Sequence, residues 1–357
     1  MRIDQVLPSL ASRDAIGAHS LALTEALREA GIASDIYYGT CTPDVADQGR
    51  PVTELGRSAK DRWLLYHASI GSPVYDVVAS RSEGKLINYH NITPAELLEG
   101  WAPQVAYEVS LGRSQLERLA KDSRFAVADS AYNEGELVAA GYHGTAVVPL
   151  LIDMTTTGRE PDPAVAARLA RTKEAGGADL LYVGKISPHK APHDLVKMLA
   201  VYRRLYDRRA RLHLVGSPLG ERYGPALRAF IAQLELTEAV DVVGSLEPAG
   251  LEAYYRAADI YVSASDHEGF CVPVVEAMGH GVPVVAYGVT AVPETVGDAG
   301  LLLASKEPLR FAAAVHRVVS DRELRDRLSA AGTARVAHFD LAGSKARFVE
   351  LLSRAAA

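Results

Sequence analysis

Short apolar runs alternate with longer stretches of helical periodicity along almost the whole chain. The apolar runs are rich in Val, Ile, Leu and Tyr, and the stretches between them are long enough for helices of several turns. Strands that alternate with helices in this way are typical of parallel sheets with right-handed crossovers. We therefore expect strands at 3–7, 34–38, 64–67, 86–90, 125–128, 145–148, 179–183, 211–215, 240–243, 259–262, 283–286 and 301–303.

Helical periodicity marks the segments between these strands, and it continues alone at the end of the chain. After residue 304 the strand-like runs stop and three helical segments follow, of which the last covers 341–357. No strand follows this last helix. The helices expected before residue 304 include 17–30, 103–121, 191–206, 221–236, 248–257 and 272–280, and a further helix is expected after Ser72 and Pro73.

The periodicity lapses once, in the segment LLIDMTTTGREPDP at 150–163, where Thr, Gly and Pro gather. Each half beside this break is long enough for a doubly wound sheet. The sequence therefore predicts an α/β protein with two Rossmann-like doubly wound parallel-sheet domains, at 1–152 and 153–338, and a final helix at 339–357. Parallel sheets bind ligands beyond the carboxyl ends of their strands, so we expect the site in a cleft between the two sheets.

Composition narrows the class of protein without naming an activity. With 48% hydrophobic residues the chain can fill two cores without a disulfide framework, and Cys41 and Cys271 are its only cysteines. The formal net charge of −6 gives no reason to expect a nucleic-acid partner. The chain starts without the pattern of a signal peptide and has no apolar run that spans a bilayer. We expect a cytoplasmic protein, with peripheral contact at the inner face of the membrane left open.

The segment SASDHEGFCVPVVEAMGHGVPVV follows an expected strand and leads into a helix that starts near Pro273. Glu268 then falls in the strand-to-helix loop, and Glu276 on the first turn of the helix. Gly269 lets a ligand approach the backbone, and the helix start offers free amides to an anion. Two glutamates at this spacing could equally be a solvated side chain and a partner for the helix dipole.

The string EGFCVPVVEAM resembles the E-x7-E motif, usually written EGFGLPxxEAM, of the retaining family 4 glycosyltransferases. Cys271 replaces the usual glycine, and it would strain the loop if that glycine is needed for a positive φ. The resemblance covers nearly the whole chain up to PETVGDAG and is strongest at 180–300. The residues that match the motif are Glu268, Gly269, Phe270, Pro273, Glu276, Ala277 and Met278.

Further matches in the second half indicate where a nucleotide sugar would bind. LLYVGKISPHKAPHDLV places Lys185 at a strand end and Lys190 just before a helix, an arrangement that suits a pyrophosphate. In VDVVGSLEPAG, the resemblance implies that the stretch from Val243 to Leu246 holds the nucleotide base, largely through backbone groups. Taken singly, these residues are equally typical of exposed charge and ordinary sheet edges.

The first half carries weaker signals. Gly17, after the loop LPSLASRDAI, starts a helix, and the resemblance implies that its backbone approaches the donor phosphates. His67 and His90 stand at the ends of successive strands, and we expect both imidazoles to project toward the cleft. The resemblance implies that His90 touches the donor sugar and is catalytic together with Lys190 and Glu268. His67 is expected on the acceptor side.

The resemblance also implies the GT-B architecture, a C-terminal helix that returns to the first domain, and transfer of a hexose with retention by front-face attack. The donor is expected to be a UDP-, GDP- or ADP-linked sugar. The resemblance implies that no metal and no cofactor is required, and the sequence has no Asp-x-Asp motif. The acceptor, an unidentified sugar or lipid-linked glycan, is expected to contact loops 8–16, 41–60 and 91–102.

Two other functions remain compatible with these residues. A sugar-nucleotide epimerase of related fold would alter the donor without an acceptor. A non-catalytic sugar-nucleotide-binding protein would keep donor affinity but show neither transfer nor donor hydrolysis.

Overall fold

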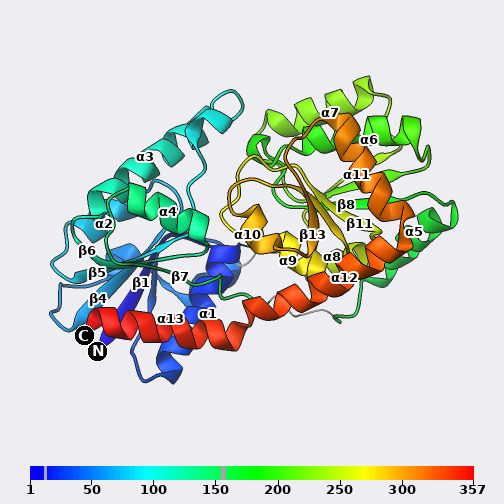
Figure 1. The fold of residues 1–357 in the computed structure, drawn as a ribbon. Coiled ribbons are helices and arrows are strands. Elements are labelled where there is room, and N and C mark those ends of the chain that lie inside the picture. The colour runs from blue at the N-terminus through cyan, green and yellow to red at the C-terminus, as the bar shows by residue number, and fades with distance from the viewer. Residues whose placement is uncertain (12–13, 154–157) are drawn as a thin grey trace. The chain divides into compact units, whose positions relative to one another are not determined.

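The structure is a computed structural model that describes residues 1–11, 14–153 and 158–357. It divides into two compact units, each built around its own parallel sheet (Figure 1). Residues 154–157 of the expected break and residues 12–13 of an expected acceptor loop lie outside the described residues. The first unit comprises Met1–Glu99, Pro103–Asp153 and Phe339–Ala357, and the second comprises Gly100–Ala102 and Met154–His338.

The first unit holds a seven-stranded parallel sheet in the order β3-β2-β1-β4-β5-β6-β7. This is the Rossmann order, in which the direction of winding reverses between β1 and β4. The strands are β1 (Arg2–Leu10), β2 (Ile36–Cys41), β3 (Arg50–Pro51), β4 (Arg62–Ala68), β5 (Gly84–Tyr89), β6 (Ser123–Ala128) and β7 (Thr145–Val147). The α-helices are α1 (Ala15–Glu29), α2 (Val74–Ala79), α3 (Pro103–Leu119), α4 (Ala131–Ala139) and α13 (Leu341–Ala356).

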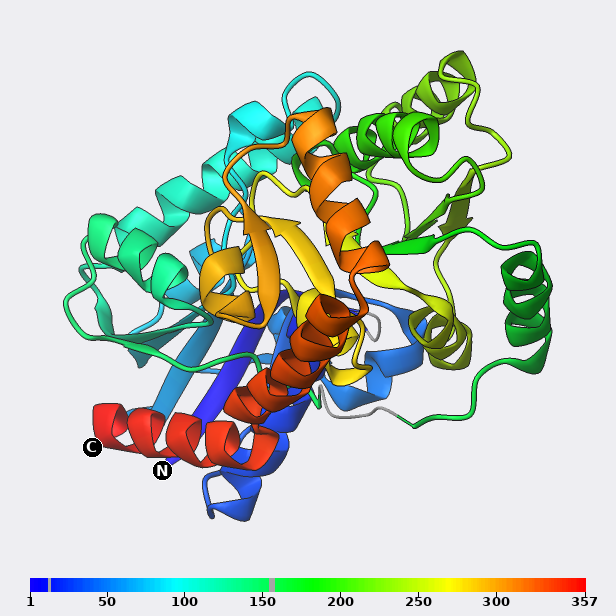
Figure 2. The same cartoon turned by 45° about the vertical axis from the view of Figure 1, so that its right-hand side comes forward.

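The second unit repeats this plan with a six-stranded parallel sheet in the order β10-β9-β8-β11-β12-β13. Figure 2 shows this sheet with α11 beside it, where α11 packs against α6. The strands are β8 (Asp179–Val183), β9 (Arg211–Val215), β10 (Val240–Gly244), β11 (Ile260–Ser263), β12 (Val284–Tyr287) and β13 (Gly300–Leu303). The α-helices are α5 (Pro163–Glu174), α6 (Pro192–Leu205), α7 (Tyr223–Gln233), α8 (Pro248–Ala257), α9 (Val272–Gly279), α10 (Val292–Val296), α11 (Pro308–Ser320) and α12 (Arg322–Val336).

The expected fold class is confirmed, because all twelve expected strands are present and every described strand pairing is parallel. The additional strand β3 has only two exposed residues and therefore leaves no apolar run. Helix α5 was not expected either. It begins where Asp162 accepts hydrogen bonds from two backbone amides and Pro163 occupies the first turn.

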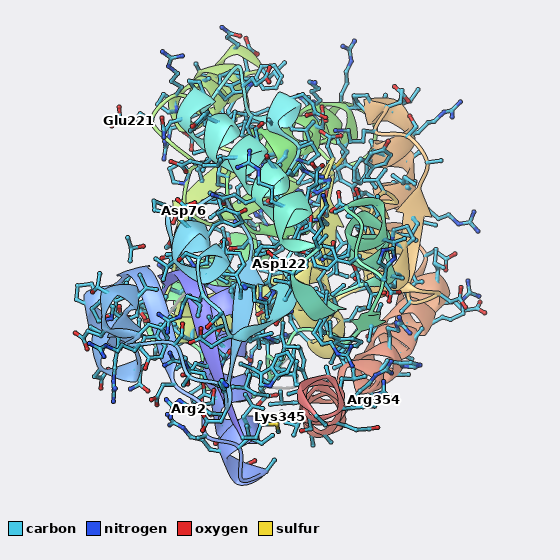
Figure 3. All side chains as sticks on the ribbon, turned by 90° about the vertical axis from the view of Figure 1, so that its left-hand side faces the viewer. Arg2, Asp76, Asp122, Glu221, Lys345 and Arg354 are labelled. Carbon is cyan, nitrogen blue, oxygen red and sulfur yellow. The ribbon has the colours of Figure 1, made fainter. Side chains whose placement is uncertain are left out.

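The final helix α13 belongs to the first unit and contacts α1 (Figure 1). It begins after Asp340, whose carboxylate accepts the backbone N–H of Gly343 at 2.6 Å. Phe348 is fully buried against α1 and the sheet. Lys345, labelled in Figure 3, forms an ion pair with Glu25 of α1 at 2.5 Å. Because Glu25 is exposed, burial of Phe348 stabilises this contact more than the ion pair does.

In the second unit, one face of the sheet packs against α6 and α11. Leu195, Leu199 and Tyr202 recur on one side of α6 and are buried, as are Phe311 and Val315 of α11. This packing holds the start of α6 at the carboxyl edge of the sheet. Among the described residues, no helix is both apolar enough and long enough to cross a membrane.

Candidate functional site

In the second sheet, winding reverses between β8 and β11, which are hydrogen-bonded neighbours. Ligands of parallel sheets bind beyond the carboxyl ends of strands at such a switch point. Lys185 follows β8 and is exposed, and Lys190 ends the short 3-10 helix η4 (Pro188–Lys190) before α6. Glu268 lies in the loop between β11 and α9. Three of the expected donor-site residues therefore lie at one edge of one sheet.

Lys190 and Glu268 form an ion pair across this switch point. The Nζ atom of Lys190 lies 2.6 Å from Oε2 of Glu268 and 3.5 Å from the backbone oxygen of His267. The Glu268 side chain is 9% exposed and the Lys190 side chain 21% exposed. Water screens such a pair less than a surface pair. A phosphate and a sugar hydroxyl arriving here would therefore find a cation and a hydrogen-bond acceptor side by side.

Strained backbone surrounds the expected site residues. Five non-glycine residues have a positive φ in the described part of the chain, and four of them adjoin expected site residues. One of them contacts Glu268 directly, because the hydroxyl oxygen of Thr290 accepts the Glu268 backbone N–H at 3.0 Å. Such conformations cluster at functional sites, where the surrounding structure holds them in place. The four residues are Asn91 after His90, Ala191 after Lys190, Cys271 within the motif, and Thr290.

Cys271 adopts the backbone conformation that glycine favours, with φ 75° and ψ 63°. It immediately precedes α9, at the position where the family motif has glycine. Its thiol is buried, and burial raises the pKa of the thiol well above its usual value, with the nearby charge of Glu268 as a second cause. The thiol therefore stays protonated at neutral pH and is unsuited to act as a nucleophile.

We expect Cys271→Gly to raise the free energy of unfolding by about 1 kcal/mol, because glycine adopts this conformation without the clash of a Cβ. Turnover should be unchanged or slightly raised. Cys271→Ala is the matched control, since it removes the thiol but keeps the Cβ. Urea unfolding would compare the three proteins, and an alanine variant more stable than the glycine variant would contradict the strain. Complete loss of turnover in Cys271→Gly would reveal a task for the thiol.

Glu276 lies one residue later in its helix than expected. Helix α9 begins at Val272, so Glu276 is on its second turn and the expected position on the first turn is wrong. Its carboxylate accepts a hydrogen bond from the hydroxyl of Tyr255 in α8 at 2.7 Å. Burial raises the pKa of Glu276, and the Tyr255 hydrogen bond offsets part of this rise. A neighbouring helix therefore orients this carboxylate.

Glycines end three adjacent strands at the same edge. Gly184, Gly216 and Gly244 follow or close β8, β9 and β10, and all have positive φ. A Cβ on Gly216 would lie 1.9 Å from the carbonyl oxygen of Gly184, so only glycine allows these backbones to approach. Val243 and Leu246 lie on either side of Gly244 and are half-buried. Their contact with a nucleotide base stays a prediction.

The motif residues between Glu268 and α9 are tied to the rest of the second unit. Phe270 is buried, and its carbonyl oxygen accepts a hydrogen bond from the hydroxyl of Thr295 at 2.5 Å. Gly269 is partly exposed. Direct contacts of Gly269, Phe270 and Lys185 with a ligand stay predictions.

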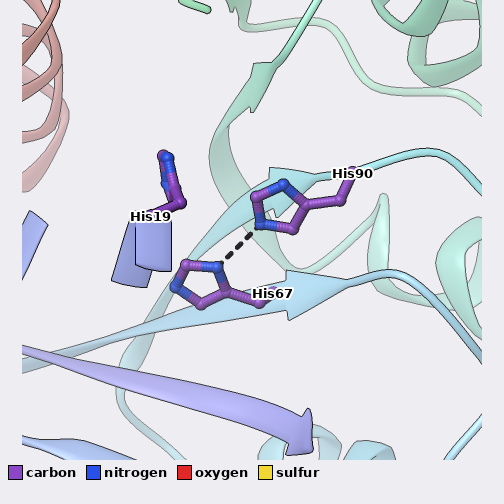
Figure 4. Close-up of side chains that lie close together, drawn as sticks. All are labelled: His19, His67 and His90. Carbon is purple, nitrogen blue, oxygen red and sulfur yellow. Dashed lines mark hydrogen bonds between the residues drawn. The ribbon is translucent and has the colours of Figure 1, made fainter. Parts of the chain in front are cut away.

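In the first unit, His67 and His90 lie at the ends of the neighbouring strands β4 and β5 and face each other (Figure 4). Nδ1 of His67 lies 2.8 Å from Nε2 of His90, and the rings are stacked with centroids 5.1 Å apart. His67 is fully buried and the His90 side chain is only 1% exposed. The two rings bond to each other inside the unit, and their expected projection toward a cleft stays a prediction. Contact of His90 with a donor sugar stays a prediction.

Gly17 is the third residue of α1, which begins two residues earlier than expected. It is buried, and a Cβ would stand 2.1 Å from the carbonyl oxygen of Ala11. The helix therefore needs glycine to pack against the start of the preceding loop, directly after β1. This packing accounts for Gly17 without a ligand, and its expected role near donor phosphates stays a prediction.

Sequence reasoning missed three polar residues that contact the two histidines. Gln5 interrupts the apolar pattern of β1, Asp129 directly follows β6, and His19 lies in α1. All three are buried. The sequence did indicate Asp129 as a site residue, because a carboxylate directly after a parallel strand lies at the edge where ligands bind. His19 gave no such signal, since it stands within an apolar helical pattern.

Residues 168–335 match the family model described as "Glycosyl transferases group 1". Two similar curated proteins are D-inositol 3-phosphate glycosyltransferases. The protein from Kineococcus radiotolerans is 32% identical over 278 residues, which cover 73% of this chain and 63% of the relative. The protein from Nocardia farcinica is 34% identical over 250 residues, covering 68% of this chain and 54% of the relative. The chain thus spans less than two thirds of these relatives.

Solved structures share the fold of almost the whole chain. Anabaena HepE in complex with UDP and glucose superposes with a TM-score of 0.76 at 19% identity, covering 99% of this chain and 100% of that one. Sucrose-phosphate synthase from Thermosynechococcus elongatus gives a TM-score of 0.75 at 19% identity, with coverages of 99% and 98%. At this identity the likeness concerns the fold, and it confirms two Rossmann-like domains of parallel sheets.

Proposed function

We propose that this chain, whose residues 168–335 match the group 1 glycosyl transferases, transfers a hexose from a nucleotide-diphosphate sugar to a hydroxyl acceptor. The observation that carries the proposal is the Lys190–Glu268 pair at the switch point of the second sheet. This pair lies inside the matched segment, at the edge where parallel sheets bind nucleotides. The similarity to curated glycosyltransferases supports the same activity.

In the proposed reaction, Lys190 and Lys185 stabilise the negative charge that develops on the leaving diphosphate. Positive groups fixed before the reaction need little reorganisation and therefore lower the barrier effectively. Glu268 accepts hydrogen bonds from hydroxyls of the transferred sugar, and Glu276 from the ribose. The family resemblance supports front-face attack with retention, in which the diphosphate helps to deprotonate the acceptor hydroxyl.

The ion pair has a role before the donor arrives. Without donor, Glu268 balances the charge of Lys190 and holds its ammonium group at the switch point. A bound diphosphate brings additional negative charge to this place, so Lys190 contacts both partners in the proposed complex. Thr290 keeps the Glu268 backbone in position while this occurs.

The proposed donor is a UDP-, GDP- or ADP-linked hexose. Structures of similar fold were solved with UDP or UDP-glucose, which favours UDP as the first donor to test. The proposed acceptor is a sugar or a lipid-linked glycan hydroxyl. We place the reaction in the cytoplasm, in keeping with a chain that has only two cysteines.

The proposal is tested by incubating purified protein with a panel of nucleotide sugars, with and without candidate acceptors, in excess EDTA and in excess Mg²⁺. We expect release of nucleoside diphosphate from one donor, with similar rates in EDTA and Mg²⁺, because cationic side chains take the place of a metal. Loss of activity in EDTA alone would contradict metal independence. An epimerised donor without acceptor would indicate the epimerase, and binding without any turnover would indicate a binding protein.

A further inference from the structure

A chain of buried hydrogen bonds crosses the switch point of the first sheet, between β1 and β4. Oε1 of Gln5 lies 2.8 Å from Nε2 of His67, and Nδ1 of His67 lies 2.8 Å from Nε2 of His90. Nδ1 of His90 then lies 3.0 Å from Oδ2 of Asp129. Four neighbouring strands thus contribute to one polar chain that ends on a carboxylate.

The orientation of Gln5 sets the direction of the whole chain. Its amide nitrogen faces the carbonyl oxygen of Ser20 at 2.9 Å, which only accepts hydrogen bonds, and Oγ1 of Thr24 at 2.7 Å. The hydroxyl of Thr24 donates to the same carbonyl, so Thr24 accepts from Gln5. The other end of the amide is therefore the oxygen, and Nε2 of His67 must carry a proton to donate to it.

The proton on Nε2 of His67 determines where the protons of the next residues lie. A neutral His67 with a proton on Nε2 has a lone pair on Nδ1, which accepts from Nε2–H of His90. The remaining nitrogen of His90, Nδ1, faces the carboxylate of Asp129, which accepts but does not donate when ionised. A hydrogen bond at this contact requires a proton on Nδ1 as well.

We infer that His90 is an imidazolium with both ring nitrogens protonated, and that Asp129 is the residue that keeps it so. In small peptides an imidazole is more basic than a carboxylate, so the proton shared between His90 and Asp129 resides on His90. Burial opposes a charge on the ring, and the nearby carboxylate of Asp129, of opposite sign and hydrogen-bonded to Nδ1, favours it. Asp129 is thus a positioning residue that acts through His90.

The other titratable groups around His90 and Asp129 are consistent with one added proton on His90. Burial and the charge of His90 both lower the pKa of His67 well below its usual value, so His67 is neutral. His19, whose ring centroid lies 5.1 Å from that of His90, accepts the backbone N–H of Leu151 on Nδ1 and faces Oδ1 of Asn88 with Nε2. Burial lowers the pKa of His19 as well. Neither ring competes for the proton.

A metal site is an alternative interpretation of this cluster, since His19, His67 and His90 lie close enough to share a metal ion. Every ring nitrogen of the three already has a hydrogen-bond partner in the described structure. A metal ion would have to displace several of these bonds at once. The proton chain therefore explains the cluster better.

The functional consequence rests on the proposed transferase activity. Because both ring nitrogens of His90 are engaged within the first unit, His90 would act on a donor through its positive charge and its backbone. Removing the charge while keeping the ring in place should then slow the reaction. Asp129→Asn does this, since the amide donates to Nδ1 and leaves His90 neutral.

The inference is tested by long-range ¹⁵N–¹H NMR of the ¹⁵N-labelled full chain at about pH 8, where ordinary histidines are neutral. Comparison with His90→Gln identifies the His90 signals among the eleven histidines. We expect both His90 nitrogens to be protonated in the wild type and only one in Asp129→Asn. An unprotonated His90 nitrogen in the wild type would overturn the inference, whatever the activity assay shows.

Turnover provides the second readout. Asp129→Asn should lower kcat about tenfold or more with little change in the KM for donor, while Asp122→Asn on the exposed turn before β6 (Figure 3) should match the wild type. Unchanged kcat in Asp129→Asn with a neutral His90 would show that the proton has no part in the reaction. If no protein shows turnover, the proposed function fails while the NMR result stands by itself.

Discussion

Lys190→Ala is expected to lower turnover at least tenfold, and up to roughly a thousandfold, while the chain stays folded. A charged contact to a developing diphosphate contributes on the order of 2–4 kcal/mol to transition-state stabilisation. Lys190 is placed for this contact by η4 and by its ion pair with Glu268. Steady-state kinetics of the purified variant with saturating donor would measure the loss.

The control must separate lost catalysis from lost structure, because Lys190→Ala leaves Glu268 without its cation in a mostly buried place. Lys190→Ala combined with Glu268→Gln removes both charges and should restore stability without restoring turnover. Lys197→Ala removes a lysine paired with Asp194 on the exposed side of α6 and should keep full turnover. Full turnover in Lys190→Ala would exclude this lysine from the reaction.

Phe348→Ala should lower the free energy of unfolding of the first unit by about 3–5 kcal/mol, because it leaves a cavity where a fully buried aromatic ring packed. The ring lies between α13 and the core of α1 and the sheet, and it contacts the buried His19. Urea unfolding of the full chain, followed by circular dichroism, would show the loss as an earlier transition for one unit.

Arg347→Ala is the matched control on the exposed side of the same helix, and its effect should stay within about 0.5 kcal/mol. The comparison tests whether α13 belongs to the core of the first unit or merely lies on its surface. A loss below about 1 kcal/mol in Phe348→Ala would mean that the contact between α13 and α1 contributes little.

Much of the fold could be predicted because its signals are local. Buried parallel strands require continuous apolar runs, so twelve strands were visible as such runs. Strand β3 was missed because a two-residue pairing contains no periodicity. Helix α10 has five residues, fewer than two turns, and helical periodicity needs a longer window.

For the candidate site, the sequence identified several residues but not their contacts. Lys185 and Lys190 were recognisable in one strand–loop–helix pattern, and Glu268 and Glu276 in another, by resemblance to the family motifs. The structure brings Lys185, Lys190 and Glu268 to one sheet edge. That Lys190 pairs with Glu268 depends on β8 and β11 being neighbours, which no local pattern states. The positive φ of Cys271 was only a possibility until the loop before α9 was seen.

The sequence by itself determined the two sheets, the order of their elements and the cationic and acidic residues at the ends of β8 and β11. The sheets and their order depend on periodicity, and the charged residues on motifs that resemble those of the family, and both are properties of local stretches of the chain. Only the tertiary structure decided that His67 and His90 turn toward each other, that Gln5 and Asp129 complete their chain, and that Tyr255 orients Glu276. The direction of a side chain and its protonation depend on neighbours distant in sequence, because burial and hydrogen bonding are properties of packing.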